Sequence, residues 1–226
     1  MQVLYEDNHL IAVNKRPGDI VQGDKTGDEP LSEKVKRYIG DKYQKPGAVF
    51  LGTLHRIDRP VSGVVLFART SKALERMNEL FREREVQKTY WAVTQSTPNP
   101  EHGKLVHYLV KKESLNKSFA SIDAKPGSSH CELDYRVLAA TERYTLVEVL
   151  PLTGRHHQIR VQLSTIGCPI KGDLKYGAKR SNPDGSIHLH ARKLEFIHPI
   201  SKLPVTITAE VPKDNLWLDL SRMAEG

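Results

Sequence analysis

The sequence predicts an α+β fold with a mixed, largely antiparallel central sheet and flanking helices. Two observations favour this class. Segments with the alternating or continuous apolar residues of strands outnumber segments with helical spacing. The strand-like segments also do not alternate regularly with the helical ones, as a doubly wound parallel sheet would require. No segment between them is long enough for a domain linker, so we expect a single domain over residues 1–226, although two closely packed halves also fit this length.

The N-terminal part predicts a hairpin, a helix and a buried strand in that order. Two short β-rich runs at 3–5 and 10–13 flank the polar residues 6–9, which is typical of a hairpin. Apolar residues recur at helical spacing between 31 and 39, and the continuous apolar run at 64–67 favours a buried strand.

A second helix and another strand follow. Ser71 is placed to cap a helix whose apolar face carries Leu74, Met77, Leu80 and Phe81. Residues 88–94 return to strand-like composition.

The C-terminal half predicts two half-buried strands with a third helix between them. Apolar and polar residues alternate at 131–137 and again at 205–211. Ile159, Leu163 and Ile166 mark the helix, which we expect to stop at Gly167.

The charge balance favours contact with phosphate. The chain carries 34 Lys and Arg against 27 Asp and Glu, and its isoelectric point is about 9.3. A basic enzyme without a nucleic-acid partner fits the same numbers. The two cysteines, Cys131 and Cys168, form neither a disulfide framework nor a Cys-x-x-Cys motif, which favours a reducing cytoplasm. No apolar run approaches the roughly 18 residues of a membrane span, so we expect no membrane association.

The first polar cluster directly precedes the apolar run at 64–67. It reads Leu-His-Arg-Ile-Asp-Arg-Pro-Val-Ser-Gly over residues 54–63. In an extended segment, Arg56 and Asp58 point to the same side. Spacing alone favours an exposed turn in which Asp58 bonds to nearby backbone N–H groups.

The second polar cluster spans residues 152–162 at the start of the third helix. Helical spacing places His156 and Arg160 on one face, opposite the apolar stripe and near the positive end of the helix dipole. Such an end attracts phosphate or carboxylate. A solvated basic face is the alternative interpretation.

The two clusters together resemble the signature motifs of the RluA-type RNA pseudouridine synthase family. That family's first motif, His-Arg-Leu-Asp followed by Thr-Ser-Gly, matches His-Arg-Ile-Asp at 55–58 and Val-Ser-Gly at 61–63. The second motif, Thr-Gly-Arg-Thr-His-Gln-Ile-Arg-Val, matches residues 153–161, with a trailing motif at 167–177. A third, Lys-x-Tyr-x-Ala, matches residues 88–92. Order and spacing agree from the Asn-Lys-Arg-Pro-Gly segment at 14–18 to the strand around Leu189.

The resemblance implies roles for particular residues around a catalytic cleft. It makes Asp58 the catalytic carboxylate, Tyr90 the residue that stacks on the flipped uracil, and Arg160 the partner that keeps Asp58 ionised. It also implies that Arg56 fills the space left by the flipped base. The resemblance further assigns substrate binding to His55, Arg155 and Leu189.

Two of these roles have an alternative. Without the motifs, Tyr90 is interpreted as an ordinary core aromatic residue, and Arg160 is interpreted as a phosphate contact. Two departures from the family motifs, Val61 for Thr and His156 for Thr, bear on hydrogen bonding in the site and on substrate preference.

The resemblance implies an enzyme without cofactor or metal that acts as a monomer on structured ribosomal or transfer RNA. His188 and His190 alternate on one strand face, but no further ligands have suitable spacing for a metal. Two alternatives stay open: an RNA-binding assembly factor without catalysis, and a glycosylase that releases the base. Product analysis separates the three, because only the synthase leaves pseudouridine in the RNA.

Overall fold

The computed structural model describes residues 1–24 and 26–225, which divide into two compact units. Unit 1 comprises residues 1–87 and 191–210, and unit 2 comprises residues 88–190 and 211–226. The chain passes from one unit to the other near the start of β5, near the start of β10 and after Glu210. The expectation of a single domain stays a prediction.

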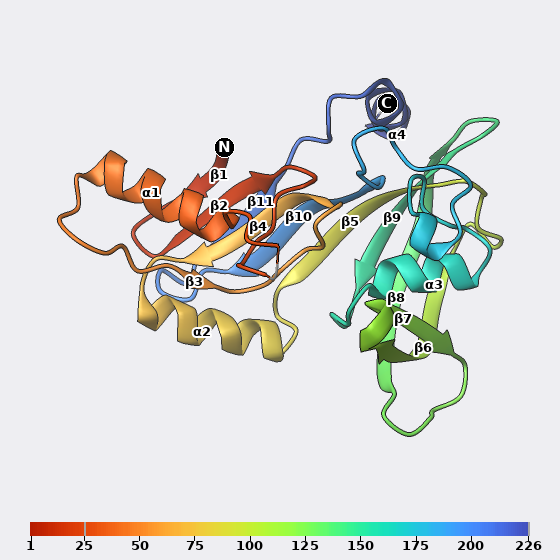
Figure 1. Cartoon of the computed structure of the whole chain (residues 1–226), viewed down its shortest axis with the longest axis horizontal. Coiled ribbons are helices and arrows are strands. Elements are labelled where there is room, and N and C mark those ends of the chain that lie inside the picture. The colour runs from red at the N-terminus through yellow and green to blue at the C-terminus, as the bar shows by residue number, and fades with distance from the viewer. Residues whose placement is uncertain (25, 226) are drawn as a thin grey trace. The chain divides into compact units, whose positions relative to one another are not determined.

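Unit 1 is a small, mainly antiparallel sheet with two helices (Figure 1). Its elements are β1 (Gln2–Glu6), β2 (Leu10–Lys15), α1 (Leu31–Tyr43), β3 (Gly52–Thr53), β4 (Ser62–Ala68), α2 (Ser71–Arg82), most of β10 (Leu189–Ile197) and β11 (Pro204–Thr208). The strand order is β1-β2-β4-β10, with β11 paired to β10 and β3 paired to β4. The pairs β1–β2, β2–β4, β3–β4 and β10–β11 are antiparallel.

A core of unit 1 lies between this sheet and α2. Figure 1 shows α2 alongside β3 and β4. Ala73 and Met77 of α2 are fully buried against apolar side chains of the sheet, which include Leu10, Ala12, Val64, Leu66, Phe196 and Ile207. Val64, Leu66 and Ala68 of β4 face this core, and the residues between them are buried as well, so β4 is apolar on both faces.

Unit 2 is a second antiparallel sheet. Its elements are β5 (Gln87–Thr94), β6 (His102–Lys112), η1 (Glu113–Leu115), β7 (Lys117–Ser121), β8 (Ser129–Ala140), β9 (Thr145–Pro151), α3 (Gln158–Thr165), η2 (Leu174–Tyr176) and α4 (Asn215–Glu225). The strand order is β5-β9-β8-β6-β7, and all four pairs are antiparallel. The prediction of a largely antiparallel α+β fold is confirmed.

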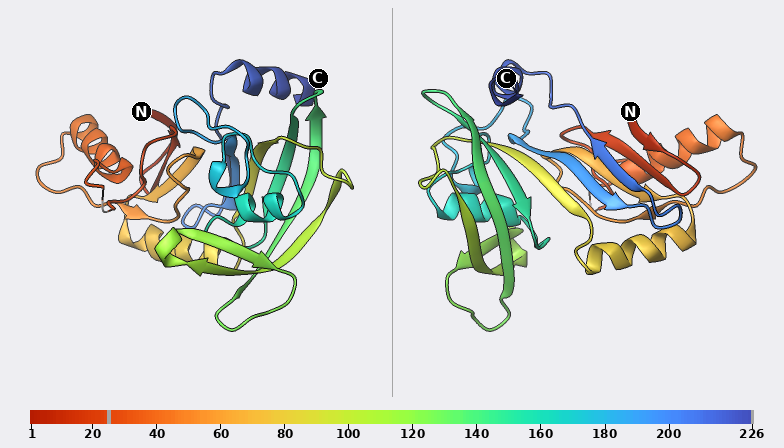
Figure 2. Two further views of the ribbon diagram at one scale, coloured as in Figure 1. Left: turned by 45° about the vertical axis from the view of Figure 1, so that its right-hand side comes forward. Right: turned by 180° about the vertical axis from the view of Figure 1, so that it is seen from behind.

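The two helices of unit 2 pack against different strands of its sheet. Trp91 and Val93 of β5 form a core with Trp217 and Leu220 of α4, and Figure 2 shows α4 beside the ends of β8 and β9. In contrast, α3 packs on β6 and β7, where its Val161 meets a cluster that contains Leu109 and Cys131.

Three local predictions need correction. Thr70, and not Ser71, caps α2: its Oγ1 accepts the N–H of Ala73 at 3.2 Å. The last strand, β11, ends at Thr208 and not at Val211; the next residue, Ala209, still donates its N–H to the backbone oxygen of Arg192, and its carbonyl accepts the Arg192 guanidinium. Helix α4 was not predicted from the sequence.

In the described part of the chain, no helix has both the length and the apolar character needed to cross a membrane.

Candidate active site

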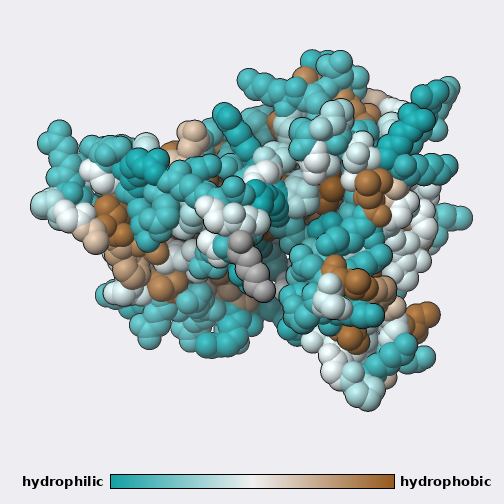
Figure 3. All heavy atoms as spheres, in the orientation of Figure 1, coloured by the Kyte–Doolittle hydropathy of each residue, from teal (hydrophilic) through white to brown (hydrophobic). Residues whose placement is uncertain are grey.

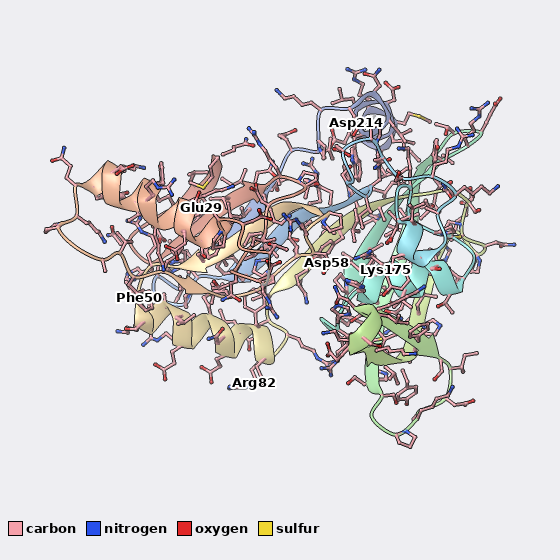
Figure 4. All side chains as sticks on the ribbon, in the orientation of Figure 1. Glu29, Phe50, Asp58, Arg82, Lys175 and Asp214 are labelled. Carbon is pink, nitrogen blue, oxygen red and sulfur yellow. The ribbon has the colours of Figure 1, made fainter. Side chains whose placement is uncertain are left out.

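Asp58 lies in the segment between β3 and β4, at the first position of a tight turn (Figure 4). The backbone oxygen of Asp58 accepts the N–H of Val61 at 3.0 Å, which closes the turn over Arg59 and Pro60. The Asp58 side chain is half-buried, and the neighbouring Ile57 is buried. The sequence therefore anchors the turn through Ile57 and leaves the carboxylate of Asp58 partly accessible.

A buried lysine holds this turn from within the fold. Lys15, at the end of β2, is 1% exposed. Its Nζ donates to three backbone oxygens: Val61 at 2.7 Å, Arg59 at 3.0 Å and Arg16 at 3.1 Å. An ammonium group has three N–H donors, so all of them are used. Lys15 therefore fixes the turn that carries Asp58.

The ionisation of Lys15 suits this role. Burial lowers the pKa of Lys15 to about 8, and the carboxylates of Asp19 and Asp58 oppose this shift. At neutral pH the side chain therefore remains an ammonium group.

Replacing Lys15 with Met should weaken the turn, because three carbonyls lose their donor. We expect the free energy of unfolding to fall by at least roughly 2 kcal/mol, since an unsatisfied buried polar group costs about 1–3 kcal/mol. Denaturant unfolding measures the loss, and Lys36→Met, on the surface of α1, is the matched control. Equal stability of the two variants would contradict the role of Lys15.

The other two predicted residues of the first motif have different surroundings. The Nε2 of His55 accepts the N–H of Leu66 at 3.0 Å, and its ring lies against Phe81 with the ring centroids 5.4 Å apart. His55 therefore ties the segment to β4 and α2. The side chain of Arg56 is exposed.

The glycine of the first motif has a steric reason. Gly63 has a φ of +116°, and a Cβ at this position would lie 2.3 Å from the backbone oxygen of Ala191. Only glycine permits this backbone conformation together with such a close approach of β4 to β10.

In unit 2, the second motif builds the start of α3. The Oε1 of Gln158 accepts the hydroxyl of Thr153 at 2.7 Å and the N–H of Arg155 at 3.0 Å, while its Nε2 donates to the backbone oxygen of Glu132 at 3.0 Å. One glutamine thereby folds residues 153–158 onto β8. His157 precedes the helix in the left-handed conformation, with a φ of 55°.

Arg160 lies inside the fold and not on a solvated face. It is 5% exposed, and its Nε and Nη2 donate to the two oxygens of Asp173 at 2.6 and 2.9 Å. The prediction that His156 and Arg160 share an exposed helix face is wrong, because α3 begins only at Gln158 and residues 158–163 are all buried. The bidentate pair with Asp173 stabilises the buried guanidinium.

The predicted partner of Arg160, Asp58, belongs to unit 1, whereas Arg160 belongs to unit 2. Their pairing stays a prediction.

Two histidines and a tyrosine pack at the N-terminus of α3. The rings of His156 and His157 are stacked with centroids 3.7 Å apart, and the Nδ1 of His157 lies 2.9 Å from the hydroxyl of Tyr176. The Cζ of Arg160 lies 5.1 Å from the centre of the Tyr176 ring. Burial, with Arg160 and His156 as the next causes, lowers the pKa of His157 to about 2.

This buried histidine should make unit 2 sensitive to acid. Below the ordinary histidine pKa of about 6.5, His157 binds a proton in the unfolded chain but not in the folded chain. The free energy of unfolding is therefore largest above this pH and decreases as the pH falls toward 2. We expect a loss of up to about 1 kcal/mol per pH unit. Between pH 7 and pH 5, the free energy of unfolding should decrease less for His157→Gln than for wild type. His102→Gln, at an exposed position, is the control and should decrease as wild type does. The same slope in all three would contradict this expectation.

Tyr90 lies on the α3 side of the unit 2 sheet. It pairs with Val149, which in turn pairs with Tyr135 of β8, so the three side chains share one face. Cys131 is on the same face of β8, and it packs against Val161 of α3. The structure thus brings Tyr90 and the helix of Arg160 to one face of one sheet.

The remaining predicted residues differ in exposure. Leu189 begins β10 and is buried, at 3% exposure. The side chain of Arg155 is exposed, and its Nε donates to the backbone oxygen of His130 at 3.3 Å.

Four residues of the site region have no role predicted from the sequence: Lys15, Gln158, Asp173 and Tyr176. All four lie within the quoted motifs, at 14–18, 153–161 and 167–177, which is the signal that points to them. Most of their contacts are with residues distant in the chain or with backbone atoms, and residue spacing does not show such contacts.

In the described residues, no group of three or more His, Cys, Asp or Glu side chains is arranged to hold a metal ion.

Comparison with known proteins identifies the family. Residues 9–165 match the model of the RNA pseudouridylate synthase family. The tRNA pseudouridine synthase C of Pasteurella multocida is 34% identical over 97% of this chain and 94% of its own length. The ribosomal large subunit pseudouridine synthase C of Vibrio cholerae is 33% identical over 92% of this chain, and the match covers 64% of the length of that relative.

A solved structure supports the same relationship. The human RNA pseudouridylate synthase domain containing 4 superposes with a TM-score of 0.80 and 25% identity, over 99% of this chain and 93% of that chain. Family model, relatives and structure agree on the family that the sequence motifs resemble. The chain therefore belongs to the RNA pseudouridylate synthase family and is an RNA pseudouridine synthase.

Proposed function

We propose that the protein isomerises a specific uridine in structured transfer or ribosomal RNA, with Asp58 as the catalytic carboxylate. The observation that carries this proposal is the turn at 58–61, which Lys15 fixes through its contacts with two carbonyls of the turn. A half-buried carboxylate on a rigid turn is suited to chemistry, because its direction is set before substrate binds. The two relatives described above are named for transfer and for ribosomal RNA, which supports both classes as substrates.

The reaction rearranges atoms without a net gain or loss. The bond from N1 of uracil to C1′ of ribose breaks, the base turns, and C5 bonds to C1′; C5 loses a proton and N1 gains one. A carboxylate serves this reaction either as a nucleophile toward the sugar or the ring, or as a base on a ribose proton. We therefore propose that Asp58 acts without cofactor or metal.

The other residues divide the work of binding. We propose that exposed Arg56 enters the space left by the flipped uridine, which offsets part of the unstacking cost of a few kcal/mol. Tyr90 then stacks on the uracil, and Leu189 packs beside it. Arg160 keeps Asp58 ionised, and Asp173 holds Arg160 in place.

Two further residues of the motifs have supporting roles. His55 positions the segment of Asp58 through its bond to Leu66, and exposed Arg155 binds an RNA phosphate.

We propose a monomer that works in a reducing cytoplasm without membrane contact. Both cysteines are buried free thiols, and burial raises the pKa of each, so neither is poised for oxidation. The excess of basic residues supports binding to phosphates through release of counterions.

A transcriptome-wide map of pseudouridine tests the proposal. Cells that lack the gene should lose one or a few sites in structured RNA, and the wild-type gene should restore them while the gene encoding Asp58→Asn should not. Unchanged maps would reject the proposal. Release of free uracil from RNA by the purified protein would instead identify a glycosylase.

A further inference from the structure

His156 connects the β6–β7 hairpin to the start of α3. The hydroxyl of Ser118, at the start of β7, donates to the backbone oxygen of His156 at 2.8 Å. The same hydroxyl lies 2.8 Å from the Nδ1 of His156. Ser118 therefore contacts both the ring and the backbone of His156.

The turn of the same hairpin adds further contacts. The Nε2 of His156 lies 3.1 Å from the Oδ1 of Asn116, and Lys175 donates to the backbone oxygen of Asn116 at 2.9 Å. The N–H of Ser118 donates to the hydroxyl of Tyr176 at 2.9 Å. Asn116 has a φ of 44°, so the turn is in the left-handed region while it makes these bonds. The hairpin is thus held at two adjacent points, both of which contact His156.

The same histidine also contacts the helix of Arg160. Its ring is stacked on His157, which is the last residue before α3. His156 therefore joins the hairpin turn to the residue from which the helix begins. The family motif has Thr at this position, and a threonine hydroxyl is too short to reach both Asn116 and Ser118. This contact is a property of this chain and not of the motif.

The hairpin presents groups that suit RNA. Lys111 and Lys112 are exposed on β6, and Lys117 lies next to the exposed ring of Phe119 on β7. Figure 3 shows hydrophobic atoms over β6 and β7 among hydrophilic ones. Cations bind phosphates, and an exposed aromatic ring provides a stacking surface for a base.

We propose that His156 is a positioning residue that determines which RNA the enzyme accepts, because it fixes the β6–β7 hairpin against α3 so that the hairpin binds RNA outside the target uridine. This inference rests on the proposed function. It assigns the hairpin to recognition and not to the isomerisation step.

Kinetics on two RNAs test the proposal. The substrates are a full-length transcript that contains the mapped uridine and a short stem-loop with the same uridine. For His156→Ala we expect KM on the full-length transcript to rise about tenfold with kcat within about twofold, and KM on the stem-loop to stay near that of wild type. His102→Ala, at the other end of β6, is the matched control and should behave as wild type.

Hydrogen exchange of residues 102–121 provides a readout that does not depend on activity. Exchange should increase in His156→Ala and in Ser118→Ala, but not in His102→Ala. In His156→Ala combined with Ser118→Ala, the increase in KM should be smaller than the product of the two single effects, because both changes break the same contact.

The outcomes separate this inference from the proposed function. If wild type forms no pseudouridine in either RNA, the proposed function fails. If wild type is active while His156→Ala keeps its KM and its exchange rates, only the role of His156 is rejected. Equal losses of kcat on both RNAs would likewise reject it, since they would place His156 in support of catalysis alone.

Discussion

Replacing Asp58 with Asn should abolish pseudouridine formation while RNA binding stays within a few-fold of wild type. The amide keeps the size of the side chain but is neither a nucleophile nor a base. Loss of an essential catalytic group commonly reduces turnover by about 10⁴-fold or more. Single-turnover assays with excess enzyme measure the reaction, and filter binding measures affinity.

The matched control for this experiment is Asp41→Asn, which makes the same chemical change on the exposed surface of α1. It should leave both quantities unchanged. Pseudouridine formation by Asp58→Asn at a rate near wild type would show that another residue supplies the catalytic group. Loss of binding along with activity would mean that Asp58 serves affinity as well as chemistry.

Replacing Asp173 with Ala should destabilise the protein by about 3–5 kcal/mol, because it leaves the guanidinium of Arg160 buried without its bidentate partner. Arg160→Met should be comparably destabilising, since the carboxylate of Asp173 is only 1% exposed. Both variants should also lose turnover. Denaturant unfolding gives the free energies, with equal m-values as a check that the same transition is measured.

A double variant separates the ion pair from its individual charges. Arg160→Met combined with Asp173→Leu removes both charges and should be less destabilised than either single variant. Asp219→Ala, which breaks the exposed pair of Asp219 with Arg222 on α4, is the control and should change stability little. Additive losses in the double variant would contradict a coupled buried pair.

Much of the fold follows from local patterns in the sequence. The hairpin of β1 and β2, the buried strand β4 and the alternating strand β8 have the predicted character. Each strand is buried on one or both faces, and the spacing of its apolar residues follows that burial. The third helix ends close to the predicted Gly167, whose N–H bonds back to the oxygen of Ser164. The missed helix α4 also has a local signal, since Asp214 accepts the N–H of Trp217 as an N-terminal cap.

Other features depend on partners that sequence spacing does not show. Hydrophobic periodicity places a charged residue such as Arg160 outside, whereas a carboxylate 13 residues later allows it to be buried. Lys15 is another case, because its acceptors lie more than 40 residues away, apart from that of Arg16. The role of Asp58 came from the family resemblance and not from its spacing, which by itself favours an ordinary turn.

The division of unit 1 into two stretches of sequence affects how the protein is made on the ribosome. Strand β4 pairs with β10, but about a hundred residues of unit 2 are synthesised between them. Because the ribosome adds roughly 5–20 residues per second, one edge of β4 stays unpaired for about 5–20 s before its partner strand is synthesised. The exposed edge is a site for mispairing or chaperone binding during this interval. Newly synthesised chains should therefore become resistant to protease in unit 1 only after residue 210 has left the ribosome.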